Sequence, residues 1–211
     1  MTVTISRLYE TYGAAERVVR DLESAGLSHK DISIVANNAD GWYKDGNGLS
    51  RADKDRGHDA GNDRPANAAK GAGIGAAVGG AAGLLTGLGL LAIPGVGPVV
   101  AAGWLVTTAA GMAAGGTTGG VIGALTHAGV SKKDAHVYAE GIRRGGTLVT
   151  AKVPDGDRAR YQAILNRSAI DLTARGAAYR KDGWTGFDEK ACPYTPEQVR
   201  RDRGTYSSPS Q

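Results

Sequence analysis

The feature that most restricts the fold of this chain is a long block without formal charge. From Gly71 to Val130, sixty consecutive residues include no Lys, Arg, Asp or Glu. Eighteen of the 33 glycines of the 211-residue chain lie in this block. The formal net charge of +4 is therefore carried entirely by the residues on either side. We expect a polar protein that is interrupted by an apolar insert.

Glycine recurs every fourth residue in two series inside the charge-free block. Residues four apart lie on one face of an α-helix. We therefore expect two glycine-striped helices that pack, and oligomerise, through these stripes. The first stripe consists of Gly71, Gly75, Gly79, Gly83 and Gly87, and the second consists of Gly103, Gly111, Gly115, Gly119 and Gly123, with Thr107 at the remaining position.

A turn separates the two series. It contains Pro94, Gly95, Gly97 and Pro98 within six residues. Proline in a helix interior costs about 3 kcal/mol, so one helix cannot run through this segment. The block thus predicts a glycine-zipper α-helical hairpin, with helices at about 68–92 and 98–128.

The first predicted helix needs an external source of stability. It contains eight glycines, and each costs about 1 kcal/mol relative to alanine in a helix interior. Close packing of glycine-lined helices offsets this cost, and so does a hydrocarbon surround. Two hypotheses follow. The hairpin associates with a lipid bilayer, or it forms a shared apolar core in a soluble homo-oligomer or filament.

Basic residues flank only the open end of the predicted hairpin. Arg64 and Lys70 precede it, and Lys132 and Lys133 follow it. Basic residues favour the cytoplasmic side of a membrane. The membrane hypothesis therefore uses these four residues as anchors at the membrane face, with both termini on the cytoplasmic side of the inner membrane. The alternative location is the cytoplasm, since the first twelve residues lack a secretory signal pattern.

The residues outside the block predict a small α+β domain with a ferredoxin-like sandwich. Periodicity predicts strands at 2–8, 31–36, 147–153 and 171–175 and helices at 11–25, 131–144 and 155–168. We expect these elements to form one two-layer core. The predicted organisation is a first domain part at 1–38, a charged flexible linker at 39–67, the hairpin at 68–130, a second domain part at 131–178, and a polar tail at 179–211 with one short helix at about 196–203.

Short motifs in the linker and tail leave alternatives open. Asp-Gly-Trp occurs at 40–42 and again at 182–184. The tryptophans either dock onto the domain or a partner, or are isolated surface side chains. Two basic runs, Arg143-Arg144 and 200–203, either meet phosphates and anionic lipid headgroups or form solvated faces.

No residue pattern predicts catalysis. The single cysteine, Cys192, excludes an internal disulfide, and the four histidines lack metal-ligand spacing. Residues 71–76 fit the letters G-x-G-x-x-A without the preceding strand or later acid that a dinucleotide site needs. We expect a non-enzymatic protein without catalytic residues, cofactor or metal site. Its expected partners are itself and a bilayer, because the weak net charge does not predict nucleic acid. A small-ligand regulatory sensor is a third alternative.

Three runs of the sequence resemble the bacterial general stress protein family, also called the heat-induced stress proteins. They are TVTISRLYETYGAAERVVRDLESAGLSHKDISIVAN, GLGLLAIPGVGPVVAAG and GVSKKDAHVYAEGIRRGGTLVTAKV. The most specific parts are the turn A-I-P-G-x-G-P and the helix–strand joint A-x-x-Y-x-x-G-x-x-x-G-G-x-L-V. The resemblance covers residues 1–38 and 71–155. It implies a ferredoxin-like domain and a role in the stress response, and it transfers no catalytic residue.

Overall fold

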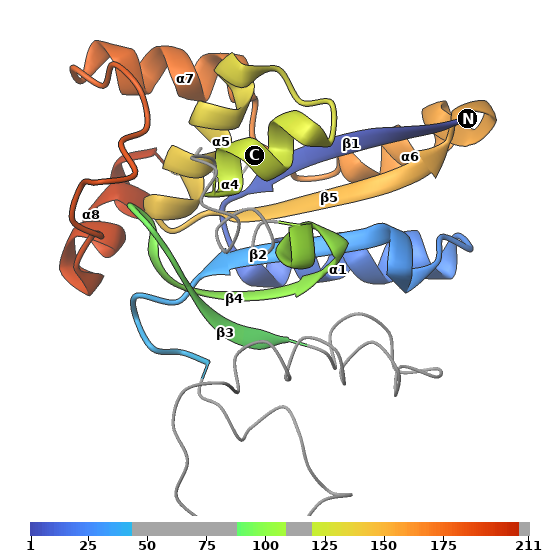
Figure 1. The fold of residues 1–211 in the computed structure, drawn as a ribbon, viewed down its shortest axis with the longest axis horizontal. Helices are drawn as coiled ribbons and strands as arrows, with labels where there is room; N and C mark the ends of the chain where they lie inside the picture. Colours follow the sequence, from blue (N-terminus) through green and yellow to red (C-terminus); the bar gives the residue numbers. More distant parts are fainter. Residues whose placement is uncertain (44–87, 109–119, 207–211) are drawn as a thin grey trace, which may run out of the picture.

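This computed structural model describes residues 1–43, 88–108 and 120–206, which form both strands and helices (Figure 1). The fold is α+β with a five-stranded antiparallel sheet, which confirms the predicted class at that level. The elements are β1 (Thr2–Tyr9), α1 (Tyr12–Ser24), the 3-10 helix η1 (His29–Asp31), β2 (Ile32–Asn37), β3 (Gly89–Ile93), β4 (Gly97–Gly103), α4 (Gly120–His127), α5 (Lys132–Arg143), β5 (Thr147–Pro154), the 3-10 helix η3 (Asp155–Asp157), α6 (Arg158–Leu165), α7 (Leu172–Lys181) and α8 (Pro196–Tyr206).

The strand order in the sheet is β1-β5-β2-β4-β3. Every neighbouring pair is antiparallel, as in the pairings of Val3 with Val153 and of Ile34 with Val149. The last strand in the sequence, β5, therefore lies between β1 and β2, the strands that α1 connects. This is a split β-α-β unit. The strands β1 and β3 form the two edges of the sheet.

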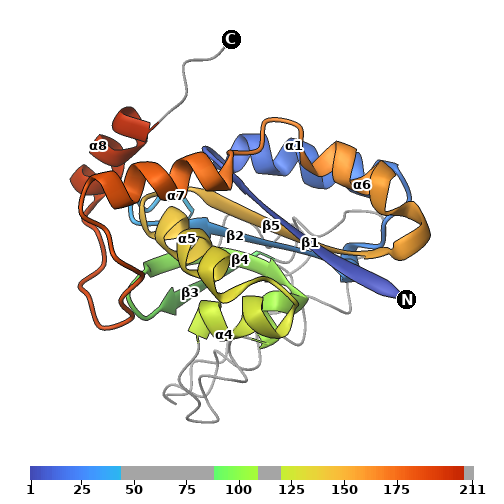
Figure 2. The same ribbon diagram turned by 90° about the horizontal axis from the view of Figure 1, so that it is seen from above.

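Helices cover both faces of the sheet, as Figure 2 shows from above. Ile34 and Val149 pack in the core beneath α1 and α6. Their neighbours Val35 and Leu148 point to the opposite face and pack in the core beneath α4 and α5. The predicted two-layer core is therefore wrong, and the domain has three layers. Because both faces are covered, all six residues of β2 are buried.

Most elements of the predicted polar domain are confirmed because local signals start and stop them. The Thr11 side chain caps α1 by accepting a bond from the Ala14 N–H (3.2 Å). Gly26 ends the same helix with a φ of +94°, and the Leu27 N–H donates to the Leu22 carbonyl (3.0 Å). Ser131 caps α5 through the Asp134 N–H (3.1 Å).

The predicted helical hairpin is wrong for residues 89–103, which form the strands β3 and β4. Leu90 pairs with Val100, and β4 also pairs with β2. Burial of Val99 and Val100 on opposite faces stabilises a strand here, whereas a helix would keep the cost of its glycines. The turn is confirmed, but it joins strands. Residues 104–108 and 120–127 are helical, and the remaining parts of the predicted hairpin, 68–87 and 109–119, lie outside the described residues.

One further prediction fails in the C-terminal part. The predicted strand at 171–175 is the start of α7, because the Asp171 carboxylate accepts bonds from the Thr173 and Ala174 N–H groups (2.8 and 3.0 Å). The predicted polar tail packs onto the domain as far as Tyr206. Its short helix is confirmed as α8, and Val199 of that helix is fully buried.

Candidate functional site

The structure places only two of the predicted stripe glycines. Gly103 ends β4 with a φ of +95°, and a Cβ there would collide with the Ile32 carbonyl oxygen. It therefore allows β4 to approach β2, rather than one helix to approach another. Gly123 lies in α4, as predicted for a helix. The others lie outside the described residues: Gly71, Gly75, Gly79, Gly83, Gly87, Gly111, Gly115 and Gly119.

The turn between β3 and β4 is covered by the C-terminal segment 187–193. Gly95 has a φ of +73°, and a Cβ on it would lie 2.6 Å from the Asp188 carbonyl oxygen. A Cβ on Gly97 would lie 2.7 Å from the Cβ of Pro193. The flanking Pro94 and Pro98 are exposed. The middle of this turn, from Gly95 to Gly97, is thus buried against that segment. It is not the free far end that a bilayer-crossing hairpin would need.

Of the four predicted membrane anchors, two are described. Lys132 and Lys133 are exposed in the first turn of α5. Arg64 and Lys70 lie outside the described residues. Within the described ranges, no helix combines the length and apolar character needed to cross a membrane.

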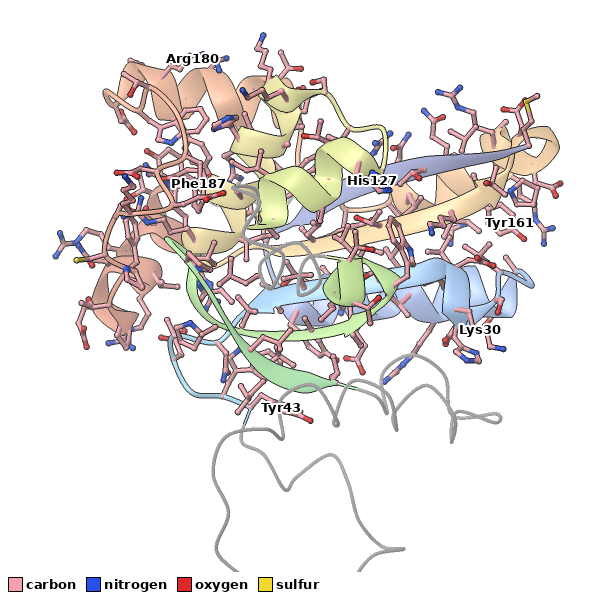
Figure 3. The ribbon with its side chains drawn as sticks, viewed as in Figure 1. Lys30, Tyr43, His127, Tyr161, Arg180 and Phe187 are labelled. Carbon is pink, nitrogen blue, oxygen red and sulfur yellow. The ribbon has the colours of Figure 1, made fainter. Side chains whose placement is uncertain are left out.

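The described residues on either side of 44–87, Tyr43 and Leu88, lie in contact with each other. The Tyr43 hydroxyl donates to the Leu88 carbonyl (2.9 Å), and Figure 3 shows Tyr43 beside β3. The Asn38 side chain bonds to both backbone groups of Tyr43. Its Oδ1 accepts from the Tyr43 N–H, and its Nδ2 donates to the Tyr43 carbonyl (3.0 Å each). The Asn38 N–H itself donates to the Pro98 carbonyl of β4 (2.8 Å). The first residues of the predicted flexible linker are therefore fixed to the sheet.

A buried ionic cluster joins the C-terminal end of α5 to α8. Glu140 is only 1% exposed, and its carboxylate accepts a bond from the Nε of Arg144 (2.6 Å). Arg144 also pairs with Asp202 of α8 (3.1 Å) and stacks over the ring of Tyr179 (4.4 Å). Burial opposes the charge on Arg144, but the bond to Glu140 and the charge of that carboxylate outweigh burial and raise the pKa of the guanidinium.

A second arginine completes the cluster from α7. Arg175 pairs with Glu10, which follows β1, and donates to the Tyr206 carbonyl at the end of α8 (2.7 Å). The cavity enclosed by these residues measures about 10 Å³, which admits no more than a single water molecule. Its charges are matched in pairs, so the cluster fixes α7 and α8 to the domain and leaves no space for a substrate.

Neither basic run is simply a solvated face, and neither is wholly free to bind phosphates or lipid headgroups. Arg143 and Arg144 are largely buried and paired with Glu140. Arg200 and Arg203 pair with Asp40 (3.3 and 3.0 Å). Glu140 is not among the site residues predicted from the sequence. The only signal for it was its spacing of three and four residues from two arginines in one helix.

Both Asp-Gly-Trp motifs contact α8. Asp40 accepts bonds from Arg200 and Arg203, and Asp182 accepts a bond from the Tyr206 hydroxyl. The tryptophans dock onto the domain, as one alternative predicted. Trp42 lies 4.7 Å from the Tyr12 ring, and Trp184 lies 5.9 Å from the Tyr179 ring.

Within the described part of the chain, no group of three His, Cys, Asp or Glu side chains is close enough to hold a metal ion. The exposed thiol of Cys192 lies in the segment after α7, where the Cys192 carbonyl accepts a bond from Arg143 (2.9 Å).

Comparison of the chain with protein-family models, with curated proteins and with solved structures gives no significant match. The resemblance to general stress proteins is therefore still a prediction from the quoted sequence runs.

Proposed function

We propose that this protein is a non-enzymatic bacterial stress-response protein that self-associates through its glycine-rich segments. The segments in question are 71–87 and 109–119, which retain the four-residue glycine period of the sequence. Small residues at that spacing allow close packing between helices of neighbouring copies. A ferredoxin-like relationship is part of the proposal, and the split unit β1-α1-β2 with β5 between its strands supports it.

One observation carries the proposal most directly. The Tyr43 hydroxyl donates to the Leu88 carbonyl (2.9 Å), so the two residues that flank 44–87 are bonded to each other. The second glycine-rich segment is likewise bounded by core residues, because Leu105 before it and Val121 after it are buried. The residues that bound both segments therefore belong to the described domain. We infer that the segments themselves self-associate through their glycine period.

The strands β3 and β4 weigh against the membrane-crossing form of the hypothesis. They remove residues 89–103 from the predicted hairpin, so the first predicted helix keeps only 18 charge-free residues (71–88) before β3. A single helix needs about 20 apolar residues to span the hydrocarbon core. Self-association in a soluble assembly is therefore favoured, and binding to a bilayer remains the alternative.

The proposal is tested with the full chain and two glycine substitutions. Gly79→Leu and Gly115→Leu each place a bulky side chain in a stripe. We expect the unmodified chain to be oligomeric by light scattering coupled to gel filtration, and each variant to shift to a smaller species. Gly156→Leu is the matched control, because a Cβ at Gly156 meets no atom within 4 Å. Unchanged oligomers in both stripe variants would contradict the proposal.

Flotation separates the two forms of the hypothesis. The full chain is mixed with vesicles of phosphatidylglycerol and phosphatidylcholine and centrifuged through a density gradient. The self-association proposal expects an oligomer that stays at the bottom of the gradient. Protein that floats with the vesicles, and loses this property in Gly79→Leu, would favour the bilayer alternative.

A further inference from the structure

The outer edge of β1 presents backbone groups to solvent. The Ser6 carbonyl accepts a bond from the Tyr138 hydroxyl (2.6 Å), and the Leu8 carbonyl accepts one from the Ile170 N–H (2.8 Å). Even-numbered residues of β1 therefore direct their backbone groups away from β5, which is the only strand paired with β1. By the same alternation Thr4 faces outward. In the described residues, its N–H and carbonyl have no hydrogen-bond partner.

A groove runs along this open edge. Its volume is about 210 Å³, and it lies between the start of α5 and the start of α6. Pockets for drug-sized ligands are larger, at roughly 300–1,000 Å³. The size fits a short length of extended chain better than a cofactor. The residues that matter for recognition are Thr4, Ser6 and Arg7 of β1, Asp134 of α5, and Arg158 and Gln162 of α6.

The edge lacks the usual protection against strand addition. Edge strands are commonly blocked by Lys, Pro or a covering segment. Here the outward positions from Thr2 to Ser6 carry only small hydroxyl side chains. Covering begins at Ser6, whose carbonyl accepts bonds from the Tyr138 hydroxyl and from Arg7, and it continues at Leu8 with Ile170. The uncovered part of β1 around Thr4 is thus the kind of edge to which a peptide strand adds in a common mode of recognition.

The charges of the groove indicate which side chains a bound peptide would carry. Arg7 forms no ion pair with a described residue, and its guanidinium donates to the Asn166 side chain (2.8 Å) and the Ser6 carbonyl (2.7 Å). Arg158 is exposed and forms no ion pair with any described residue. Asp134 is the one acid of the groove lining, and the Ser131 hydroxyl donates to it (2.8 Å) at the favourable N-terminal end of α5. Two arginines thus remain without a carboxylate.

We propose that this groove binds an extended peptide with acidic side chains, which adds to the sheet as a strand beside β1. Backbone bonds to the N–H and carbonyl of Thr4 and to the N–H of Ser6 provide affinity, and carboxylates opposite Arg7 and Arg158 provide selectivity. The site is separate from the glycine-rich segments. Its occupation does not depend on self-association.

The probe is a fluorescein-labelled hexapeptide of alternating valine and glutamate, and its binding to the full chain is followed by fluorescence anisotropy. We expect saturable binding that weakens at least tenfold in Arg158→Glu. Arg160→Glu is the matched control and keeps the affinity, because Arg160 lies on the same helix but does not line the groove. A peptide of alternating valine and lysine should bind at least tenfold more weakly.

Backbone pairing is tested separately. Thr4→Pro removes the outward N–H and is expected to weaken binding at least tenfold. A probe N-methylated on alternate residues tests the same bonds on the unmodified chain, so the result does not depend on how the variant folds. Equal binding of all probes and variants would overturn the proposal. A second result would also overturn it: the chain does not bind the peptide but forms an oligomer, and Thr4→Pro abolishes that oligomer. A second copy of the chain would then occupy the edge of β1.

Discussion

At the scale of single residues, buried tyrosine hydroxyls tie elements together. Tyr9 donates to the Leu165 carbonyl at the end of α6 (2.6 Å), and Tyr138 donates to the edge strand. Burial raises the pKa of Tyr9, and it raises the pKa of Tyr179 to about 12, although the neighbouring Arg175 opposes the latter shift. These hydroxyls hold their protons in the folded protein beyond the pH at which tyrosine in an unfolded chain ionises, about 10.

The first prediction concerns alkaline unfolding. The stabilisation from Tyr179 is fully present below about pH 10, where both states are protonated at this group, and it is lost as the pH rises toward 12. The free energy of unfolding in urea should therefore fall steeply between these values. Tyr179→Phe should show a shallower fall. Circular dichroism measures unfolding, and equal slopes in the variant and the unmodified chain would contradict the assignment.

The second prediction concerns a close contact of α5. A Cβ on Gly141 would overlap the side chain of Leu8, which is 1% exposed and has little room to move. Gly141→Ala should destabilise the domain by about 1–3 kcal/mol through overpacking, even though alanine favours a helix. Gly156→Ala is the control, because no atom lies within 4 Å of its added Cβ. Thermal unfolding of both variants measures the difference, and a stabilised Gly141→Ala would disprove the contact.

At the scale of elements, the α8 helix depends on one buried side chain and the ionic cluster. Val199→Asp buries a carboxylate without a partner and should cost roughly 2 kcal/mol or more of docking free energy. Trypsin should then cleave at Arg200 and Arg201 much faster than in the unmodified chain. Thr205→Asp adds the same charge at an exposed position of α8 and should stay resistant. Equal cleavage rates in both variants would show that α8 does not depend on Val199.

The elements that sequence analysis predicted well are those with local boundaries. Helix α5 begins at a Ser131 cap and ends before Gly145, which has a φ of +100°. Residues 89–103 lacked such a decisive signal. A short apolar run such as that from Pro98 to Ala102 fits a buried strand as well as a helix. Its pairing with β2 decided the outcome, and that contact is distant in sequence.

At the scale of the whole molecule, the domain should not need residues 44–87. Their ends meet where the Tyr43 hydroxyl bonds to the Leu88 carbonyl (2.9 Å). Replacing them with about five glycine and serine residues should preserve the fold and keep the unfolding midpoint within a few degrees. Circular dichroism and amide NMR spectra check this. Loss of the sheet signals would mean that the core includes part of that segment.

The candidate sites could be predicted only in part, because their residues come together through contacts that are distant in sequence. The basic runs at 143–144 and 200–203 were visible in the sequence, but two of their pairings, Arg144 with Asp202 and Arg203 with Asp40, join elements that are distant in sequence. The edge groove also draws on β1, α5 and α6. Such sites arise from the topology of the sheet, and no local spacing encodes them.

The Tyr43–Leu88 closure also bears on how fast the chain folds. Asn37 of β2 pairs with Val99 of β4, and 62 positions separate them in sequence. Forming that pairing requires closing the intervening loop, and the entropic cost grows with the logarithm of its length. Shortening the loop about threefold lowers the cost by roughly 1 kcal/mol. The shortened chain should therefore refold several-fold faster, with little change in its unfolding rate.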